Sequence, residues 1–301
     1  MSEPVNPTTM IKGRAPFPFE TIALALAFSP RLEALIAETA RLAQLHQAKA
    51  LFIHVGKKTP EKQRQLAGFL NHYGFNDSNS AVIWEQGQPV DAIIKVCKEN
   101  VVDLLIIGAL QKENMLQYYM GSVSREVSRK AKCSVLMITE PRLHPVSFQH
   151  VIVNGHEHAK TLSTLETALY FVKKEGVAEL MVATEVDIPA LSMSLANGST
   201  EEELEQVHHN VIREEELRWD RMKDQLDPGA VQLRFQAIPG KSGHTIRSFA
   251  LARKADLLIV NSPDHHLSIF DRIFTHDLEY LLSDMPCSLL IVHSRMPEQP
   301  L

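Results

Sequence analysis

The strongest limit on how this chain can fold is a pattern that occurs twice. The sequence VDLLIIG ends at Gly108 and its counterpart ADLLIVN ends at Asn261, an offset of 153 residues. The segments KCSVLMI and PCSLLIV place Cys133 and Cys287 at an offset of 154. Two separate blocks at nearly one offset indicate an internal duplication. We therefore expect two copies of one domain, over residues 1–143 and 144–301.

Residues 102–139 of the first copy read as a strand, a glycine loop, a short helix and a second strand. The apolar run Leu104–Ile107 is typical of a buried parallel strand and ends at Gly108. Gly121 and Ser122 then begin a helix, with Val123 in its first turn. The free amides at such a helix start can hold an anion such as phosphate. An ordinary turn explains the same residues.

The rest of the first copy alternates strands and helices. Three strands are predicted over Thr21–Ala27, Ala50–Val55 and Ser80–Trp84. Ser29-Pro30 and Thr59-Pro60 each combine a helix N-cap with proline at the first helical position. This alternation predicts an α/β fold, with a parallel sheet covered by helices on both faces.

The second copy repeats this order after a proline-containing linker, Pro141–Ser147. It differs by a long polar helix predicted over Thr200–Leu226, with a capping box from Thr200 and Glu203. Its expected buried residues share a helical spacing; they are Leu204, Val207, Val211, Met222 and Leu226. A helix with this acidic start is typical of a solvated surface, and a partner-binding role is the alternative.

Composition excludes several classes of protein. The chain has 301 residues, a formal net charge of −5 and a pI near 6.3, which argue against nucleic acid as the main partner. It contains no apolar run long enough for a membrane span, and its first residues lack a signal-peptide core, so we expect a cytoplasmic protein. Cys97, Cys133 and Cys287 lie in apolar contexts, which predicts buried, reduced thiols.

The 14 histidines do not predict a metal site. Three pairs stand close together in the sequence: His156/His158, His208/His209 and His265/His266. None has a carboxylate or cysteine at a metal-ligand spacing, so solvated histidines are the better interpretation. Nucleophilic catalysis by Ser122 is not supported either, because the sequence offers no nucleophile elbow or other triad signature.

The order of elements, the segment GQPVDAII and the two closing strands resemble the universal stress protein family in its tandem two-domain form. The family's nucleotide signature is a glycine, a second glycine three positions later, nine residues and then Gly-Ser. Here Gly108, Gln111 and Gly121-Ser122 keep that spacing, with one glycine replaced. The resemblance implies a doubly wound five-stranded sheet in each domain, pairing of the domains through their last strands and, in some members, bound ATP. It also implies an aspartate after the first strand, where this chain has Ala27.

This resemblance implies that an adenine nucleotide, if bound, contacts Gly108, Gly121, Ser122 and Val123 in the first domain. The nearby cations Lys112 and Arg125 favour an anion there. The second copy has Asn261, Asp264 and Phe274-Thr275 at the motif positions and His156 at the aspartate position. It also places Asp277 and Glu279 in the first helical turn. Nucleotide binding is therefore expected in the first domain only.

Three functions remain open from the sequence. The first is a stress-response protein that binds ATP or another adenine nucleotide in its first domain. The second is a nucleotide-independent module that binds a protein partner, motivated by Ala27, Gln111 and the degenerate second copy. The third is a slow ATPase, although the sequence offers no catalytic residue. The last strands, Cys133–Ile138 and Cys287–Val292, are expected to pair in an intramolecular pseudo-dimer, and a homodimer remains open.

Overall fold

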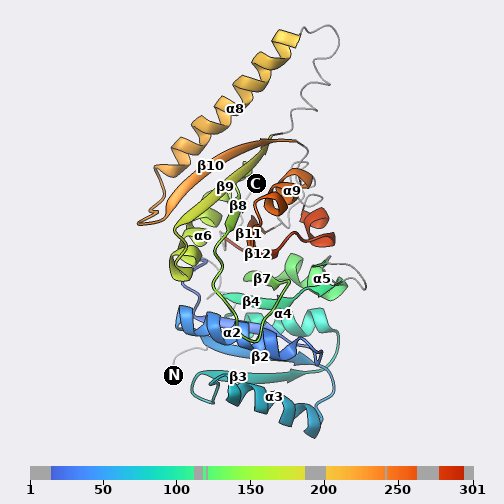
Figure 1. Cartoon of the computed structure of the whole chain (residues 1–301). Coiled ribbons are helices and arrows are strands. Elements are labelled where there is room, and N and C mark those ends of the chain that lie inside the picture. The colour runs from blue at the N-terminus through green and yellow to red at the C-terminus, as the bar shows by residue number, and fades with distance from the viewer. Residues whose placement is uncertain are drawn as a thin grey trace, which may run out of the picture. The chain divides into compact units, whose positions relative to one another are not determined.

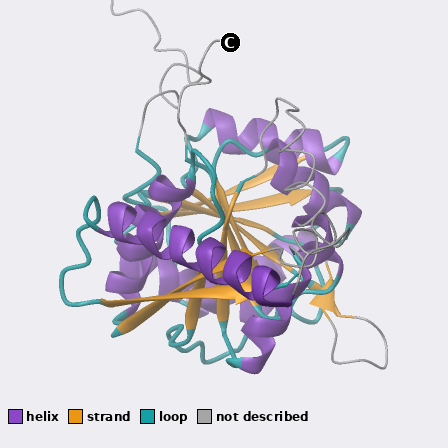
Figure 2. Ribbon diagram, turned by 90° about the horizontal axis from the view of Figure 1, so that it is seen from above, coloured by secondary structure: helices purple, strands orange, loops and turns teal. Residues whose placement is uncertain are grey.

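The computed structural model describes residues 15–111, 118–119, 121–186, 201–240, 243–262 and 278–294. The chain forms two compact units. The first comprises Met1–Ser147 with Ser288–Leu301, and the second comprises Phe148–Cys287. Each unit combines strands with helices, and Figure 2 shows helices lying around the strands of the chain. The expected fold class is therefore confirmed.

The first unit has six neighbouring strands in the order β3-β2-β1-β4-β7-β12 (Figure 1). The first five are mutually parallel. Most residues of the central strands are buried, as expected for a sheet covered on both faces. The strands are β1 (Thr21–Ala25), β2 (Lys49–Val55), β3 (Ser80–Glu85), β4 (Leu104–Gly108), β7 (Ser134–Ile138) and β12 (Ser288–Val292).

Strand β12 closes the second sequence copy but lies in the first unit. It runs antiparallel to β7, with Leu290 opposite Leu136. The Ser288 hydroxyl also accepts a hydrogen bond from the backbone N–H of Thr139, at 3.3 Å. Pairing of the two last strands was expected from their apolar sequences, and it is confirmed. This pairing covers the edge that β7 would otherwise expose.

The described residues of the first unit form four helices, and the starts of two of them test the predicted caps. Thr59 caps α3, because its hydroxyl accepts a hydrogen bond from the Lys62 N–H at 3.3 Å. The predicted cap at Ser29 is wrong: its hydroxyl instead accepts from the Arg31 N–H, and α2 begins at Leu32. The helices are α2 (Leu32–His46), α3 (Pro60–His72), α4 (Pro89–Glu99) and α5 (Ser122–Lys130).

The second unit has four parallel strands in the order β10-β9-β8-β11. Helix α6 ends at Gly176, whose φ of 76° favours glycine. The strands are β8 (Val151–Asn154), β9 (Glu179–Val186), β10 (Gln232–Pro239) and β11 (Leu257–Asn261). The helices are α6 (Thr161–Glu175), α8 (Glu201–Lys223) and α9 (His244–Ala252).

The long polar helix exists as α8, but its expected buried stripe is only partly correct. Leu226, just after α8, is buried, and so is Trp219, which stacks on Phe235 with ring centroids 5.4 Å apart. Val207 and Val211 are only half-buried, because that part of α8 lies beyond this aromatic contact. The side chains of Thr200, Glu203 and Leu204 fall outside the described residues.

One aspartate in each repeated block has the same structural role. Asp103 is fully buried, and its carboxylate accepts hydrogen bonds from the backbone N–H groups of Glu20 and Thr21, both at 2.8 Å. Asp256 likewise accepts from the N–H groups of Gln149 and His150, at 2.8 and 3.1 Å. Each carboxylate ties the strand of its block to the start of its unit's first strand. The duplication is therefore visible in matching contacts.

All three cysteines are buried, as the sequence predicts. Burial raises the pKa of the Cys287 thiol to about 12. The pKa of Cys97 is also raised, first by a hydrogen bond with Cys133 and then by burial. Among the described residues, no helix has the length and hydropathy needed to cross a bilayer.

Candidate functional site

The candidate site of the first unit lies at the carboxyl ends of β1 and β4. The chain passes from β1 to β2 and β3 on one side, then returns to β4 on the other side of β1. In doubly wound sheets, ligands bind at such a reversal of strand order, outside the carboxyl ends of the strands. Gly108 ends β4 at this edge, and Ala27 follows β1 there.

The predicted phosphate loop leads to the start of α5. Gly121 is the N-cap residue of α5, and no side chain caps the helix. Ser122 and Val123 are exposed in the first turn, which contains no acidic residue. The backbone N–H of Val123 has no helical acceptor, because it lies in the first turn, whereas the side chain of Val127 is buried in the core. This start can donate backbone hydrogen bonds to an anion.

The two motif glycines are also explained by packing. A Cβ atom at Gly108 would lie 2.8 Å from Leu35 Cδ1, and one at Gly121 would lie 2.9 Å from Leu110 Cδ1. Real Cβ contacts are not that short, so larger residues at either position would force a leucine to move. The sequence pattern alone therefore does not distinguish a phosphate loop from a closely packed one.

Arg31 brings a positive charge to this edge, although no pattern in the sequence indicates it. Its guanidinium donates hydrogen bonds to the carbonyl oxygens of Ala109, after β4, and Thr139, after β7. It also lies 5.9 Å from the centre of the Tyr118 ring. Burial lowers the pKa of Arg31, but Tyr118 and Glu140 raise it, and a guanidinium stays charged near neutral pH.

Tyr118 and Glu140 stand beside Arg31. The Tyr118 hydroxyl donates to Glu140 Oε1 at 3.3 Å, and Glu140 directly follows Thr139, a partner of Arg31. Tyr118 belongs to a short hairpin of β5 (Leu110–Gln111) and β6 (Tyr118–Tyr119). Because Leu110 also faces Gly121, this hairpin joins the Arg31 group to the start of α5.

Three aromatic rings occupy the same edge next to β1, on the side away from β4. Phe28, His54 and Trp84 come from the ends of β1, β2 and β3, with ring centroids 4.9 to 6.0 Å apart. Lys62 lies 5.1 Å from the centre of the Phe28 ring, and Lys58 lies 5.9 Å from that of Trp84. We call these three rings the aromatic cluster. Its half-buried Phe28 and Trp84 provide an apolar surface beside the site.

His54 holds this cluster in place as a neutral imidazole. Its Nδ1 lies 3.2 Å from the carbonyl oxygen of Leu26, which can only accept, so Nδ1 carries the proton. Nε2 is then the acceptor for the Lys62 ammonium at 3.4 Å. Burial lowers the pKa of His54, and the charge of Lys62 lowers it further, against the opposing hydrogen bond to Leu26. The ring is therefore uncharged near pH 7.

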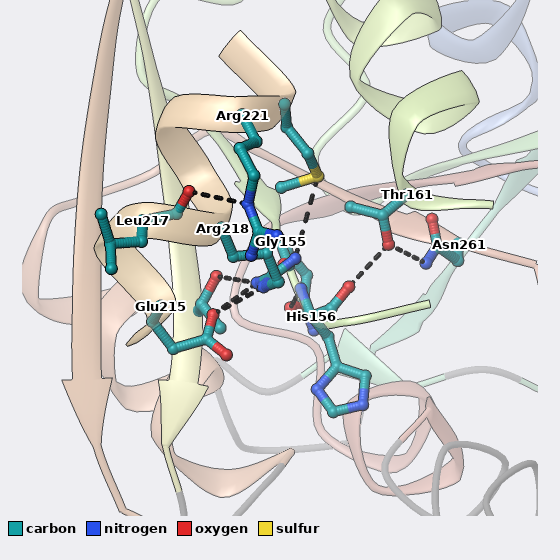
Figure 3. Close-up of polar contacts among 11 residues, drawn as sticks. Gly155, His156, Thr161, Glu215, Leu217, Arg218, Arg221 and Asn261 are labelled. Atoms are coloured by element: carbon teal, nitrogen blue, oxygen red, sulfur yellow. Dashed lines mark hydrogen bonds and ion pairs between the residues drawn. The ribbon is translucent and has the colours of Figure 1, made fainter. Parts of the chain in front are cut away.

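The second unit has a different arrangement at the matching edge (Figure 3). Arg218 of α8 donates to the carbonyl oxygen of Gly155 at 2.7 Å and pairs with Glu215 at 2.5 Å. Asn261 stands in place of the first motif glycine, and its amide donates to the Thr161 hydroxyl at 3.2 Å. Thr161 in turn donates to the carbonyl oxygen of His156 at 2.6 Å. Internal hydrogen bonds thus bridge the ends of β8 and β11.

Several predicted positions lie outside the described residues. They are the Gln111 side chain, Lys112, Asp264, His265/His266, Phe274-Thr275 and Asp277. Of the histidine pairs, His158 Nδ1 accepts from the Lys160 N–H at 3.1 Å. The described part of the chain contains no group of three or more His, Cys, Asp or Glu residues placed to hold a metal.

These features define a doubly wound α/β protein whose first unit places Arg31 and a helix start without a side-chain cap at one edge of its sheet. Residues 74–139 match the model of the universal stress protein family. A universal stress protein from Mycobacterium tuberculosis is 38% identical over 52 residues, which are 17% of this chain. The chain spans 36% of the length of that relative. The predicted resemblance to this family is therefore confirmed, and the residues that match the family model lie in the first unit.

Solved structures extend the likeness of fold to most of the chain. A universal stress protein from Archaeoglobus fulgidus is similar over 91% of this chain and 96% of its own, with a TM-score of 0.61 and 18% identity. A functionally unknown protein from Pseudomonas aeruginosa is similar over 91% of this chain and 92% of its own, with a TM-score of 0.63 and 13% identity. At such identities the likeness concerns the fold.

Proposed function

We propose that this protein acts in the cytoplasm as a stress-response regulator whose first unit binds an adenine nucleotide. The observation that carries the proposal is the meeting of two anion-accepting features at one edge of the sheet. One is the start of α5, where the N-cap residue Gly121 has no side chain to bind the first backbone N–H groups. The other is the guanidinium of Arg31. The helix start offers backbone N–H groups and the positive end of a dipole.

The aromatic cluster supports a base beside that phosphate site. Phe28 follows β1, and Trp84 lies at the end of β3. Both rings therefore lie at the same carboxyl edge of the sheet as the end of β4. Aromatic faces stack on any nucleobase and contribute about 1–3 kcal/mol for each stacked base. A ligand with an aromatic base and a phosphate group fits this edge, because the base can contact the aromatic cluster and the phosphate can contact Arg31 and the start of α5. No residue of this edge is proposed to be catalytic.

Equilibrium dialysis of protein purified free of nucleotide tests this function, with AMP and ATP as ligands and a phosphate-release assay alongside. Arg31→Gln removes the guanidinium charge, and we expect it to weaken AMP binding about ten- to a hundredfold, the usual cost of a lost charged hydrogen bond. Arg41→Gln is the matched control, because Arg41 pairs with Glu38 within α2. Absence of binding to the wild type overturns the proposal.

A second function is favoured by the packing of the motif glycines. Leu35 and Leu110 would lie only 2.8 and 2.9 Å from Cβ atoms at Gly108 and Gly121, and Ala27 lacks a carboxylate. These contacts suit a fold kept for binding a protein partner without nucleotide. The same dialysis separates the two functions, since only the first predicts a saturable signal. Release of phosphate from ATP would instead indicate the slow ATPase.

A further inference from the structure

Glu140 is the acidic residue placed beside the proposed phosphate site. Its carboxylate accepts the hydrogen bond from Tyr118, whose ring lies under the Arg31 guanidinium. The peptide carbonyl directly before Glu140, that of Thr139, is itself bound by Arg31. Glu140 is thus held near Arg31 by two routes, one through a side chain and one through the backbone.

This arrangement gives Arg31 an internal counter-charge. Among the described residues, its two hydrogen bonds to Ala109 and Thr139 use two of the five N–H donors of a guanidinium, which leaves donors for a ligand. A phosphate that binds here is attracted to the same positive charge of Arg31 as the exposed carboxylate of Glu140. The repulsion between this carboxylate and the ligand increases with the negative charge of the ligand.

We propose, resting on the proposed function, that Glu140 is the residue that sets which nucleotides the site prefers. Its charge makes the site favour ligands with a single phosphate group over triphosphates. Tyr118 is a positioning residue, because its hydroxyl fixes the carboxylate. The helix start and one arginine match one phosphate group, whereas further phosphates add charge that Glu140 repels.

The test measures the affinity of adenosine, AMP and ATP, whose negative charge increases in that order, in magnesium-free buffer. Glu140→Gln keeps the shape and removes the charge. We expect no change for adenosine and a tightening of roughly two- to fivefold for each ligand charge, as expected for exposed charges about 8 Å apart whose interaction is screened by water and salt. Tyr118→Phe, which retains the carboxylate but releases it, should give a smaller gain in the same order.

Glu126→Gln is the matched control, because Glu126 is an exposed residue of α5 that pairs with Lys130 at 2.6 Å. An equal gain for adenosine and ATP, or no gain in Glu140→Gln, overturns the inference while leaving the proposed function intact. Failure of all nucleotides to bind to the wild type and to the variants overturns the proposed function and this inference together. A gain of equal size in Glu126→Gln would show a general effect of net charge, and it also overturns the inference.

Discussion

The matched aspartates of the two repeats allow a quantitative prediction. Asp103 is fully buried and accepts two backbone N–H groups at 2.8 Å, whereas the side chain of Asp256 is 38% exposed. Asparagine keeps the shape of the side chain but replaces charged acceptors by neutral ones. Charged hydrogen bonds contribute about 1.5–3 kcal/mol and neutral ones about 0.5–1.5 kcal/mol. Asp103→Asn should therefore lower the free energy of unfolding by about 2–3 kcal/mol.

The same substitution at Asp256 should cost under about 1 kcal/mol, because water can satisfy the freed groups. Each unit contains one of the two tryptophans, Trp84 in the first and Trp219 in the second. Urea unfolding followed by fluorescence in Trp219→Phe and Trp84→Phe backgrounds reports the two units separately. The midpoint of the first unit should fall by roughly 1–2 M in Asp103→Asn at constant slope. A larger loss in Asp256→Asn would refute this reasoning.

The pKa of His54 is lowered in the folded chain, so below about pH 6.5 the unfolded chain binds more protons than the folded chain, and the free energy of unfolding falls as the pH decreases. His54→Gln should reduce this fall, as measured by urea titrations from pH 7 to 5. The raised pKa values of Cys97 and Cys287 predict slow labelling by a thiol reagent in the native protein, and labelling as fast as in urea would contradict this. Gly121→Phe should abolish AMP binding without unfolding the first unit, because the atom nearest to the new side chain belongs to the half-exposed Leu110. Ser122→Ala should weaken AMP binding by up to about a hundredfold. Thr275→Ala should leave AMP binding unchanged, and calorimetry can measure all three variants.

The alternation of strands and helices was predictable because each apolar run and cap is local in the sequence. Thr59 caps its helix as expected, since proline at the next position leaves it few other roles. Ser29 shows the same dipeptide but forms a turn with Arg31, and α2 starts later. The same type of dipeptide thus caps a helix at Thr59 but not at Ser29, and the residues around it decide between the two outcomes.

The candidate site was predictable in position but not in composition. The spacing of Gly108 and Gly121 located the edge of the sheet. Arg31 escaped notice because its partners, Ala109 and Thr139, lie 78 and 108 residues away in the sequence. Its role depends on the strand order that brings β4 and β7 to the same edge, and no local pattern encodes such a contact. The partial exposure of Val207 and Val211 likewise could not be predicted from their spacing, because it depends on the path of α8 relative to the rest of its unit.

The proposed function requires a nucleotide phosphate to bind at the start of α5 in the first unit. Titration of isotope-labelled protein with AMP, followed by amide chemical shifts in NMR spectra, tests this binding. We predict saturable shifts of the Ser122 and Val123 amides and of the Arg31 side chain, with the Gly155 and Asn261 amides of the second unit unchanged. Saturable shifts confined to Gly155 and Asn261, or no shifts at millimolar AMP, would contradict the claim.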